Sequence, residues 1–162
     1  MPTTRTFIVL AALVSGILAG TNIDRALVAM PAWQQLGAPT WAAFTRYASL
    51  GNGLFIYPVE AIAAVLLTLS AAIGSHYDRG CSRVVRSLLD GAAALTIGGL
   101  ALTVVTTPAV LSVRNQNDPA VLQRAMEAYW FWGNLRGAAH VLAFIAELAA
   151  LDVLLHPRNS AD

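Results

Sequence analysis

The segment from Tyr129 to His140, with the sequence YWFWGNLRGAAH, places an arginine and a histidine one helical turn apart in an apolar run. Asn134 precedes Arg136 by two residues, and His140 follows it by four. A charged side chain at bilayer depth costs at least about 2.5–3.5 kcal/mol, so such residues are rare and usually face a cavity or a partner. Imidazoles and buried carboxylates can abstract protons, and a fixed guanidinium can hold an anionic oxygen. The segment therefore indicates either a reactive site or a structural contact.

Polar residues recur at a comparable depth in three other apolar segments. Tyr57 and Glu60 are three residues apart, so they share one face of a helix. A rise of about 1.5 Å per residue from each helix end puts all these groups in the outer half of a bundle. The expected polar layer comprises Asn22, Asp24 and Arg25, then Tyr57, Pro58 and Glu60, then Thr103, Thr106 and Thr107, and finally Trp130, Trp132, Asn134, Arg136 and His140.

Each of these residues also has a purely structural interpretation. Arg25 and Arg136 could form buried ion pairs with Asp24 or Glu60 that fix helix register. His140 could be a hydrogen-bonded structural histidine. The tryptophans of this chain are typical of the aromatic belt at a membrane interface: Trp33, Trp41, Trp130 and Trp132. The convergence of four segments at one depth is what favours a cavity.

The composition is that of an integral membrane protein. Of 162 residues, 57% are hydrophobic and 12% are charged, and the mean hydropathy is +0.61; soluble domains carry about 25% charged residues. A net charge of +1 provides no basic face for nucleic acid. Cys81 is the single cysteine, and His76 and His156 lie far from His140, so we expect no metal site and no cofactor.

Four segments are long enough to cross about 30 Å of hydrocarbon. We therefore expect an all-α, integral membrane four-helix up-and-down bundle, with residues 1–162 forming a single membrane domain. The first segment begins like a signal peptide, but helix-compatible sequence continues to Pro31, which favours a retained span. Turn-forming sequences separate the segments at 31–39, 75–83 and 114–120. The expected spans are about 6–30, 53–75, 84–113 and 129–155.

The arginines differ in number between the two ends of such a bundle. One end carries Arg5, Arg79, Arg83, Arg86 and Arg158, and the other carries Arg46, Arg114 and Arg124. Cytoplasmic loops carry the excess of positive charge. We therefore expect both termini in the cytoplasm, with the protein in a bacterial inner membrane.

Three short motifs resemble those of the anthrone oxygenase-like family of small four-span membrane proteins. They are AG followed by VAMPAW, then TRYASLGNGLFIYP, and then the W…NLR pattern of WFWGNLRG. Through this resemblance Pro31, Asn134 and Arg136 match motif positions of the family. Asp24, Arg25, Glu60 and His140 are added on grounds of depth and spacing alone.

The resemblance implies oxidation of an activated aromatic methylene by O₂ without metal or flavin. Such a reaction needs a base and a cation that holds the enolate oxygen. We expect Glu60 or His140 as the base, Arg136 with Arg25 as the cations, and the flat apolar substrate stacked on Trp130 or Trp132. The remaining binding residues are expected to be Asn22, Asp24, Tyr57 and Asn134.

The alternative is a non-catalytic binding, transport or accessory protein whose charges pair internally. An enzyme should keep an arginine and an acid unpaired around one cavity, whereas a scaffold should close each charge against its opposite. Asp90, Glu147 and Asp152 lie toward the inner side and keep a transporter open as an interpretation. The expected partners are the lipid bilayer, an apolar small molecule and O₂, and a homo-oligomer stays open.

Overall fold

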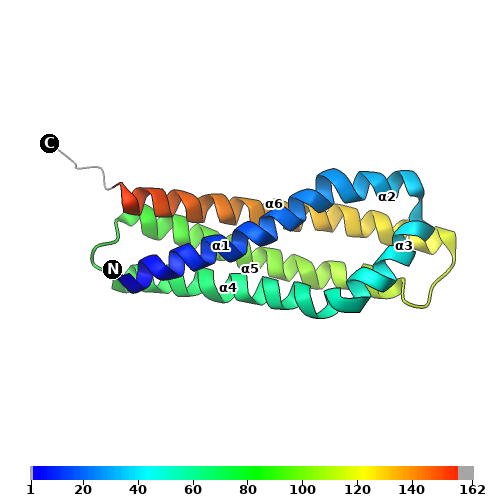
Figure 1. Ribbon diagram of the computed structural model, residues 1–162, viewed down its shortest axis with the longest axis horizontal. Coiled ribbons are helices and arrows are strands. Elements are labelled where there is room, and N and C mark those ends of the chain that lie inside the picture. The colour runs from blue at the N-terminus through cyan, green and yellow to red at the C-terminus, as the bar shows by residue number, and fades with distance from the viewer. Residues whose placement is uncertain (1, 157–162) are drawn as a thin grey trace.

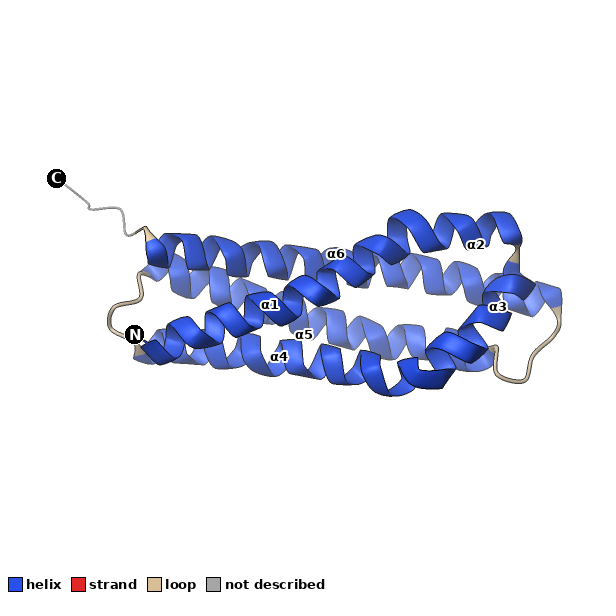
Figure 2. Cartoon of the chain, in the orientation of Figure 1, coloured by secondary structure: helices blue, strands red, loops and turns tan. Residues whose placement is uncertain are grey.

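A computed structural model describes residues 2–156, and every regular element in that range is a helix (Figures 1 and 2). Arg158 lies outside the described residues. Two elements, η1 and η2, are π-helical turns. In chain order the elements are α1 (Pro2–Asp24), η1 (Arg25–Ala29), α2 (Met30–Leu36), α3 (Ala38–Tyr47), η2 (Ala48–Asn52), α4 (Gly53–Tyr77), α5 (Arg83–Ser112) and α6 (Pro119–Leu155).

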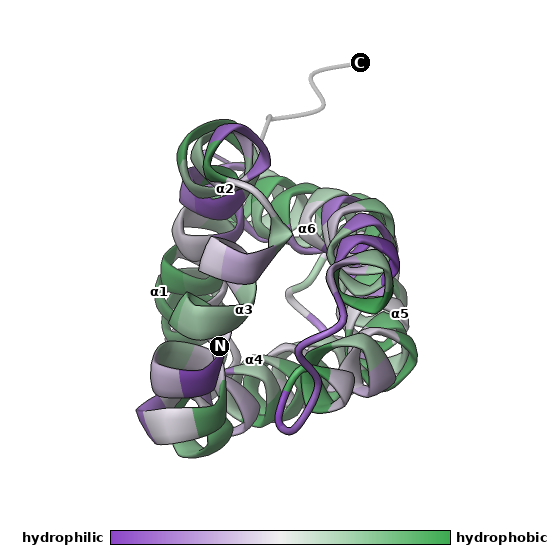
Figure 3. Cartoon of the chain, turned by 90° about the vertical axis from the view of Figure 1, so that its right-hand side faces the viewer, coloured by the Kyte–Doolittle hydropathy of each residue, from purple (hydrophilic) through white to green (hydrophobic). Residues whose placement is uncertain are grey.

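The four long helices α1, α4, α5 and α6 run up and down around a common axis, as the end view in Figure 3 shows. α1 packs against α4 and α6, and α5 packs against the same two helices. This arrangement confirms the all-α four-helix bundle. Four helical stretches are long and apolar enough to cross a membrane, namely Thr3–Leu36, Ala38–Tyr77, Arg83–Ser112 and Pro119–Leu155. Their length and composition indicate an integral membrane protein.

Capping residues set the starts of α5 and α6. The Ser82 hydroxyl accepts a hydrogen bond from the Val85 amide at 3.3 Å, and the Asp118 carboxylate accepts one from the Ala120 amide at 2.9 Å. Side chains of these types at the N-cap satisfy amide groups that have no partner within the helix. Pro119 is the first residue of α6, where its missing N–H costs nothing. α6 thus begins ten residues before the expected span at 129.

The segment after Pro31, expected to be a turn, is largely helical. Pro31 lies in the first turn of α2, a position that tolerates proline. The chain reverses only at Gly37, whose φ of 89° suits glycine. α3 then crosses the end of the bundle (Figure 1). Arg46 of α3 holds this position by donating to the carbonyl oxygens of Val113 and Gln116 in the α5–α6 connection.

This end of the bundle has its own hydrophobic core. Trp41 is fully buried, and its ring centroid lies 5.6 Å from that of Tyr129. Trp41 is therefore not the exposed belt residue that was expected, because α3 folds back onto α6 and protein encloses its ring. The core comprises Met30, Ala38, Trp41, Ala42, Val113, Leu122, Ala125, Met126 and Tyr129.

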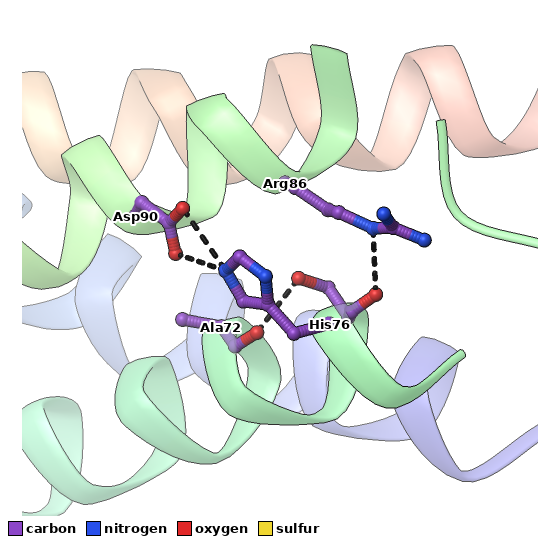
Figure 4. Close-up of polar contacts among 5 residues, drawn as sticks. Ala72, His76, Arg86 and Asp90 are labelled. Carbon is purple, nitrogen blue, oxygen red and sulfur yellow. Dashed lines mark hydrogen bonds and ion pairs between the residues drawn. The ribbon is translucent and has the colours of Figure 1, made fainter. Parts of the chain in front are cut away.

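The opposite end, where α1 begins and α6 ends, contains a second core. It comprises Ile8, Ala71, Ala72, Cys81, Val85, Leu89, Ala93 and Ala150. On the outside of this core His76 Nε2 lies 3.0 Å from the Asp90 carboxylate, and Arg86 donates from Nε to the Ser75 carbonyl oxygen at 3.1 Å (Figure 4). These contacts join the end of α4 to the start of α5. The two cores leave the middle of the bundle for polar side chains.

Candidate functional site

A cavity of about 140 Å³ lies between the four long helices, on the side of α2 and α3. One buried water needs about 10–15 Å³ of such space, so the cavity has room for a small organic molecule. Every long helix contributes to its lining. The lining residues with polar side chains are Thr21, Asn22, Arg25, Ser49, Tyr57, Glu60, Thr103, Thr106, Thr107, Tyr129, Arg136 and His140.

Arg25 enters the cavity at the point where α1 changes to a π-helical turn. Such turns insert an extra residue into a helix and occur frequently at functional sites. The Arg25 guanidinium lies over two tyrosine rings, 5.3 Å from the Tyr57 centroid and 5.7 Å from the Tyr129 centroid. These distances are within the range of cation–π attraction. Arg25 thus joins α1 to α4 and α6, and it has no carboxylate partner within residues 2–156.

Arg136 is the most buried arginine in the lining, with 9% of its surface exposed. Its Nη1 donates to the Thr106 hydroxyl oxygen at 3.4 Å. That hydroxyl itself donates to the Thr103 carbonyl oxygen at 2.9 Å, so its lone pair is free to accept from the guanidinium. The contact is long, and the Tyr129 side chain also interacts with this guanidinium.

Glu60 faces the same cavity from α4, below Tyr57 and Pro58. Arg25 acts on this carboxylate electrostatically. Among the described residues, however, no lysine, arginine or histidine nitrogen lies within 4.0 Å of the Glu60 carboxylate, and no carboxylate oxygen lies that close to Arg25 or Arg136. The ion pairs considered from the sequence are therefore not formed. The charges face a shared space instead.

His140 is almost completely buried, with 2% of its surface exposed, yet its ring reaches the cavity. Its position depends on Gly99 of α5, because a Cβ atom at residue 99 would lie 2.5 Å from His140 Cε1. Within residues 2–156 neither ring nitrogen of His140 has a hydrogen-bond partner in the structure. The contacts within residues 2–156 therefore do not support the interpretation of His140 as a hydrogen-bonded structural histidine.

The structure brings together six of the ten expected site residues. Asn22, Arg25, Tyr57, Glu60, Arg136 and His140 line the cavity. Asn22 donates from Nδ2 to the Leu18 carbonyl oxygen at 2.7 Å. A Cβ atom at Gly137 would lie 3.3 Å from Asn22 Cβ, so this glycine allows α1 and α6 to approach closely.

The other four expected residues lie outside the lining. Asp24 is exposed, and the Trp130 side chain has 43% of its surface exposed. Trp132 and Asn134 are partly buried but do not reach the cavity. Helical geometry explains the positions of Trp130 and Asn134, because these residues point away from the face that carries residues 136 and 140. Trp132 lies one turn before Arg136, at the edge of that face, and is still outside the lining.

Tyr129 is a lining residue that the sequence interpretation missed. It is 94% buried and contacts both Arg25 and Trp41. Its spacing of seven residues from Arg136 carried the signal, since positions i and i+7 share one face of a helix. The η2 residues Ser49 and Leu50 were also missed, because the bend before α4 was not apparent from the sequence.

Within residues 2–156, no group of three or more histidine, cysteine, aspartate and glutamate side chains is placed to hold a metal ion. Comparisons of the chain with protein-family models, with curated proteins and with solved structures found no match. The functional interpretation therefore rests on the residues themselves.

Proposed function

We propose that this protein is a cofactor-independent membrane oxygenase that acts on a flat apolar molecule, such as an anthrone or a related aromatic polyketide. One observation carries the proposal: two arginines and two potential bases face one cavity without an ion pair among them. In a protein without a site these side chains would be expected to form ion pairs, because an unpaired charge away from water raises the free energy of the folded state.

The chemistry assigns a different task to each type of side chain. Glu60 or His140 removes a proton from the activated methylene of the substrate. The electron pair left behind delocalises onto the substrate oxygen, which Arg136 holds as an enolate in a site that excludes water. O₂ then oxidises this carbanion, and the balance is CH₂ + O₂ → C=O + H₂O. Tyr57 and Tyr129 replace the tryptophans as the aromatic groups that can contact the substrate.

The lining also supports entry from the bilayer. Leu54 and Tyr57 of α4 and Leu111 of α5 line the cavity and are 48%, 38% and 45% exposed. Side chains that border both the cavity and the outer surface indicate an opening toward lipid. An apolar substrate dissolved in the membrane would reach Arg136 by this route.

A turnover assay tests the proposal. The purified protein in lipid nanodiscs is incubated with an anthrone, and quinone formation and O₂ uptake are recorded against empty nanodiscs, which measure spontaneous oxidation. We expect one O₂ consumed per quinone formed, at a rate that exceeds the spontaneous one. Saturable binding of the anthrone without turnover would replace the oxygenase with the binding or transport alternative.

The proposal includes the orientation of the protein in the membrane. We place both termini in the cytoplasm of a bacterium, because Arg5, Arg79, Arg83 and Arg86 lie at the end where α1 begins and exceed the arginines at the other end. The cavity then lies nearer the outer face of the inner membrane. A substrate held in the outer leaflet would be the nearest one to the site.

A further inference from the structure

The inner half of the bundle contains a second buried acid, Glu147 of α6, which the proposed oxygenase reaction does not use. None of its surface is exposed. The Ser15 hydroxyl of α1 lies 3.2 Å from Oε1, and the Thr68 hydroxyl of α4 lies 2.6 Å from the same oxygen. Among the described residues Oε2 has no hydrogen-bond partner. Three helices therefore meet at one carboxyl group, and within the described part of the chain no arginine or histidine forms an ion pair with it.

The hydrogen bonds of Thr68 indicate the protonation state of this carboxyl group. The Thr68 hydroxyl also lies 2.8 Å from the Ala64 carbonyl oxygen, although it has a single hydrogen to donate. Six other threonines donate their hydrogen to a carbonyl oxygen three or four residues earlier: Thr21, Thr40, Thr96, Thr103, Thr106 and Thr107. If Thr68 does the same, the hydrogen between Thr68 and Glu147 belongs to the carboxyl group.

The charged groups that line the cavity lie about 10 Å or more from Glu147, counted along the helices. Along α6, His140 is seven residues away, or about 10 Å. Glu60 is eight residues from Thr68, and Arg25 is ten residues from Ser15, or about 12 and 15 Å. Asp90 of α5 and Asp152 of α6 are exposed and contact His76 and His156. An isolated carboxylate in such surroundings favours its neutral form.

The packing on the two sides of Glu147 is unequal. Toward the end where α1 begins, the core contains Ile8, Val85 and Leu89, all with at most 1% of their surface exposed. Toward the cavity the buried residues include the small side chains of Ala64 and Ala143, with Gly99 beside His140, together with Leu18 and Thr96. Small side chains permit transient water entry more readily than a close-packed aliphatic core.

We propose that Glu147 is a proton-binding site at the closed inner end of the bundle, and that its proton exchanges through the cavity and not through the opposite end. The site is a carboxylic acid at neutral pH, held by Ser15 and Thr68. The transferred species is a proton alone: Glu147–COOH releases H⁺ to water that enters from the cavity, and takes it back by the same route. This proposal does not depend on the oxygenase reaction.

Infrared spectroscopy of the protein in nanodiscs tests the protonation state. A protonated carboxyl group has a C=O stretching band separate from that of carboxylates. We expect this band at pH 7 in the wild-type protein, a shift of it in Thr68→Val, and its loss in Glu147→Gln. Because Thr68→Val keeps the acid, its band shift assigns the signal even where Glu147→Gln fails to fold. A wild-type spectrum without the band, or a band that neither substitution alters, would overturn the proposal.

The route of exchange is tested by a matched pair of substitutions on α6. Ala143 and Ala150 are buried to 1% and 0% exposure and lie about one turn on either side of Glu147. On transfer to D₂O, Ala143→Val should slow the isotope shift of the carboxyl band several-fold, whereas Ala150→Val should leave its rate near the wild-type value. Slowing by Ala150→Val alone would show exchange through the end where α1 begins, and would contradict the proposed route.

Discussion

The two halves of the bundle treat buried polar groups in opposite ways. Around the cavity, Arg25, Arg136 and Glu60 face open space without ion pairs among the described residues. In the inner half, the hydrogen-bond partners of the enclosed Glu147 among residues 2–156 are two hydroxyl groups, while ion pairs there, such as His76–Asp90, lie on the exposed surface. Burial without a partner is costly in both cases. In the outer half the unpaired charged groups lie beside a cavity. In the inner half the proposed protonation of Glu147 gives a neutral acid, which needs no cation.

The packing differs in the same way. The inner core joins all four long helices through aliphatic side chains. The outer core joins α2 and α3 to α5 and α6, and none of the residues that form it belongs to α4. The bend at η2 and the π-helical turn at η1 both lie in the outer half. The irregular backbone of the bundle therefore lies beside the cavity, as is frequent at functional sites, and the inner half consists of regular helices.

The largest expected effect is at Arg136. Arg136→Gln keeps much of the length and hydrogen-bonding capacity but removes the charge that holds the enolate. We expect activity on an anthrone to fall about a hundredfold or more, as when an oxyanion donor is removed. Arg124→Gln is the matched control, because Arg124 lies on the same helix and is exposed. Thermal unfolding in detergent accompanies the assay; a stable Arg136→Gln variant with full activity would remove Arg136 from the site.

Gly99 tests the position of His140. In Gly99→Ala the new Cβ atom would lie 2.5 Å from the imidazole ring, so the ring has to move out of place. We expect a loss of about 1–3 kcal/mol in the free energy of unfolding from overpacking, together with reduced turnover.

The neighbouring glycine is the control for this substitution. A Cβ atom at Gly98 would have no neighbour within 4 Å, so Gly98→Ala should stabilise the helix by up to about 1 kcal/mol. Equal effects of the two substitutions on thermal unfolding would contradict the close contact between α5 and His140.

Thr68 tests the enclosed acid of the inner half. Thr68→Val removes the hydroxyl group at 2.6 Å from Glu147 Oε1 and leaves this oxygen with Ser15 alone. We expect a loss of about 1–3 kcal/mol in the free energy of unfolding, the range for a buried polar group that loses its partner. Ser70→Ala on the same helix removes an exposed hydroxyl group and should change stability by much less. Denaturation in mixed micelles measures both variants.

The smallest effect is expected at the exposed pair of the inner end. His76 and Asp90 lie 3.0 Å apart with about half of each side chain exposed. Solvent screening limits such a pair to less than about 1 kcal/mol, so His76→Ala and Asp90→Ala should each change the unfolding temperature slightly. A double-mutant cycle measures their coupling. A coupling above this limit would show that surface pairs hold the inner end as firmly as its core does.

The loop beside this pair provides the test of orientation. Burial raises the pKa of the Cys81 thiol, so at pH 7 it has little reactive thiolate, and its labelling should accelerate as the pH rises. Cys81 is also only 4% exposed, which makes it a poor reporter of sidedness. An exposed cysteine introduced as Arg79→Cys in a Cys81→Ala background should react with an impermeant maleimide only after the cytoplasmic face is opened. Labelling of intact cells would reverse the proposed orientation.

Much of this arrangement was determined by the sequence. Apolar runs of the length of a bilayer, separated by turn residues, predicted four antiparallel helices, since backbone groups in lipid need internal partners. The rise per residue was enough to bring Glu60, Arg136 and His140 to one depth, and the structure has all three in one cavity lining. These inferences succeeded because they depend on local geometry along single helices.

The remaining features depend on contacts between segments that are distant in the chain. Only tertiary structure decided that Trp41 folds back onto Tyr129, and that Arg25 lies over two tyrosine rings instead of pairing with Glu60. Depth along a helix is additive in residue number, but rotation about the helix axis changes wherever a π-helical turn or a proline intervenes. Even within the continuous helix α6, neither Trp132, one turn before Arg136, nor Asn134 is in the cavity lining, because the neighbouring helices decide which part of a helix face borders the cavity.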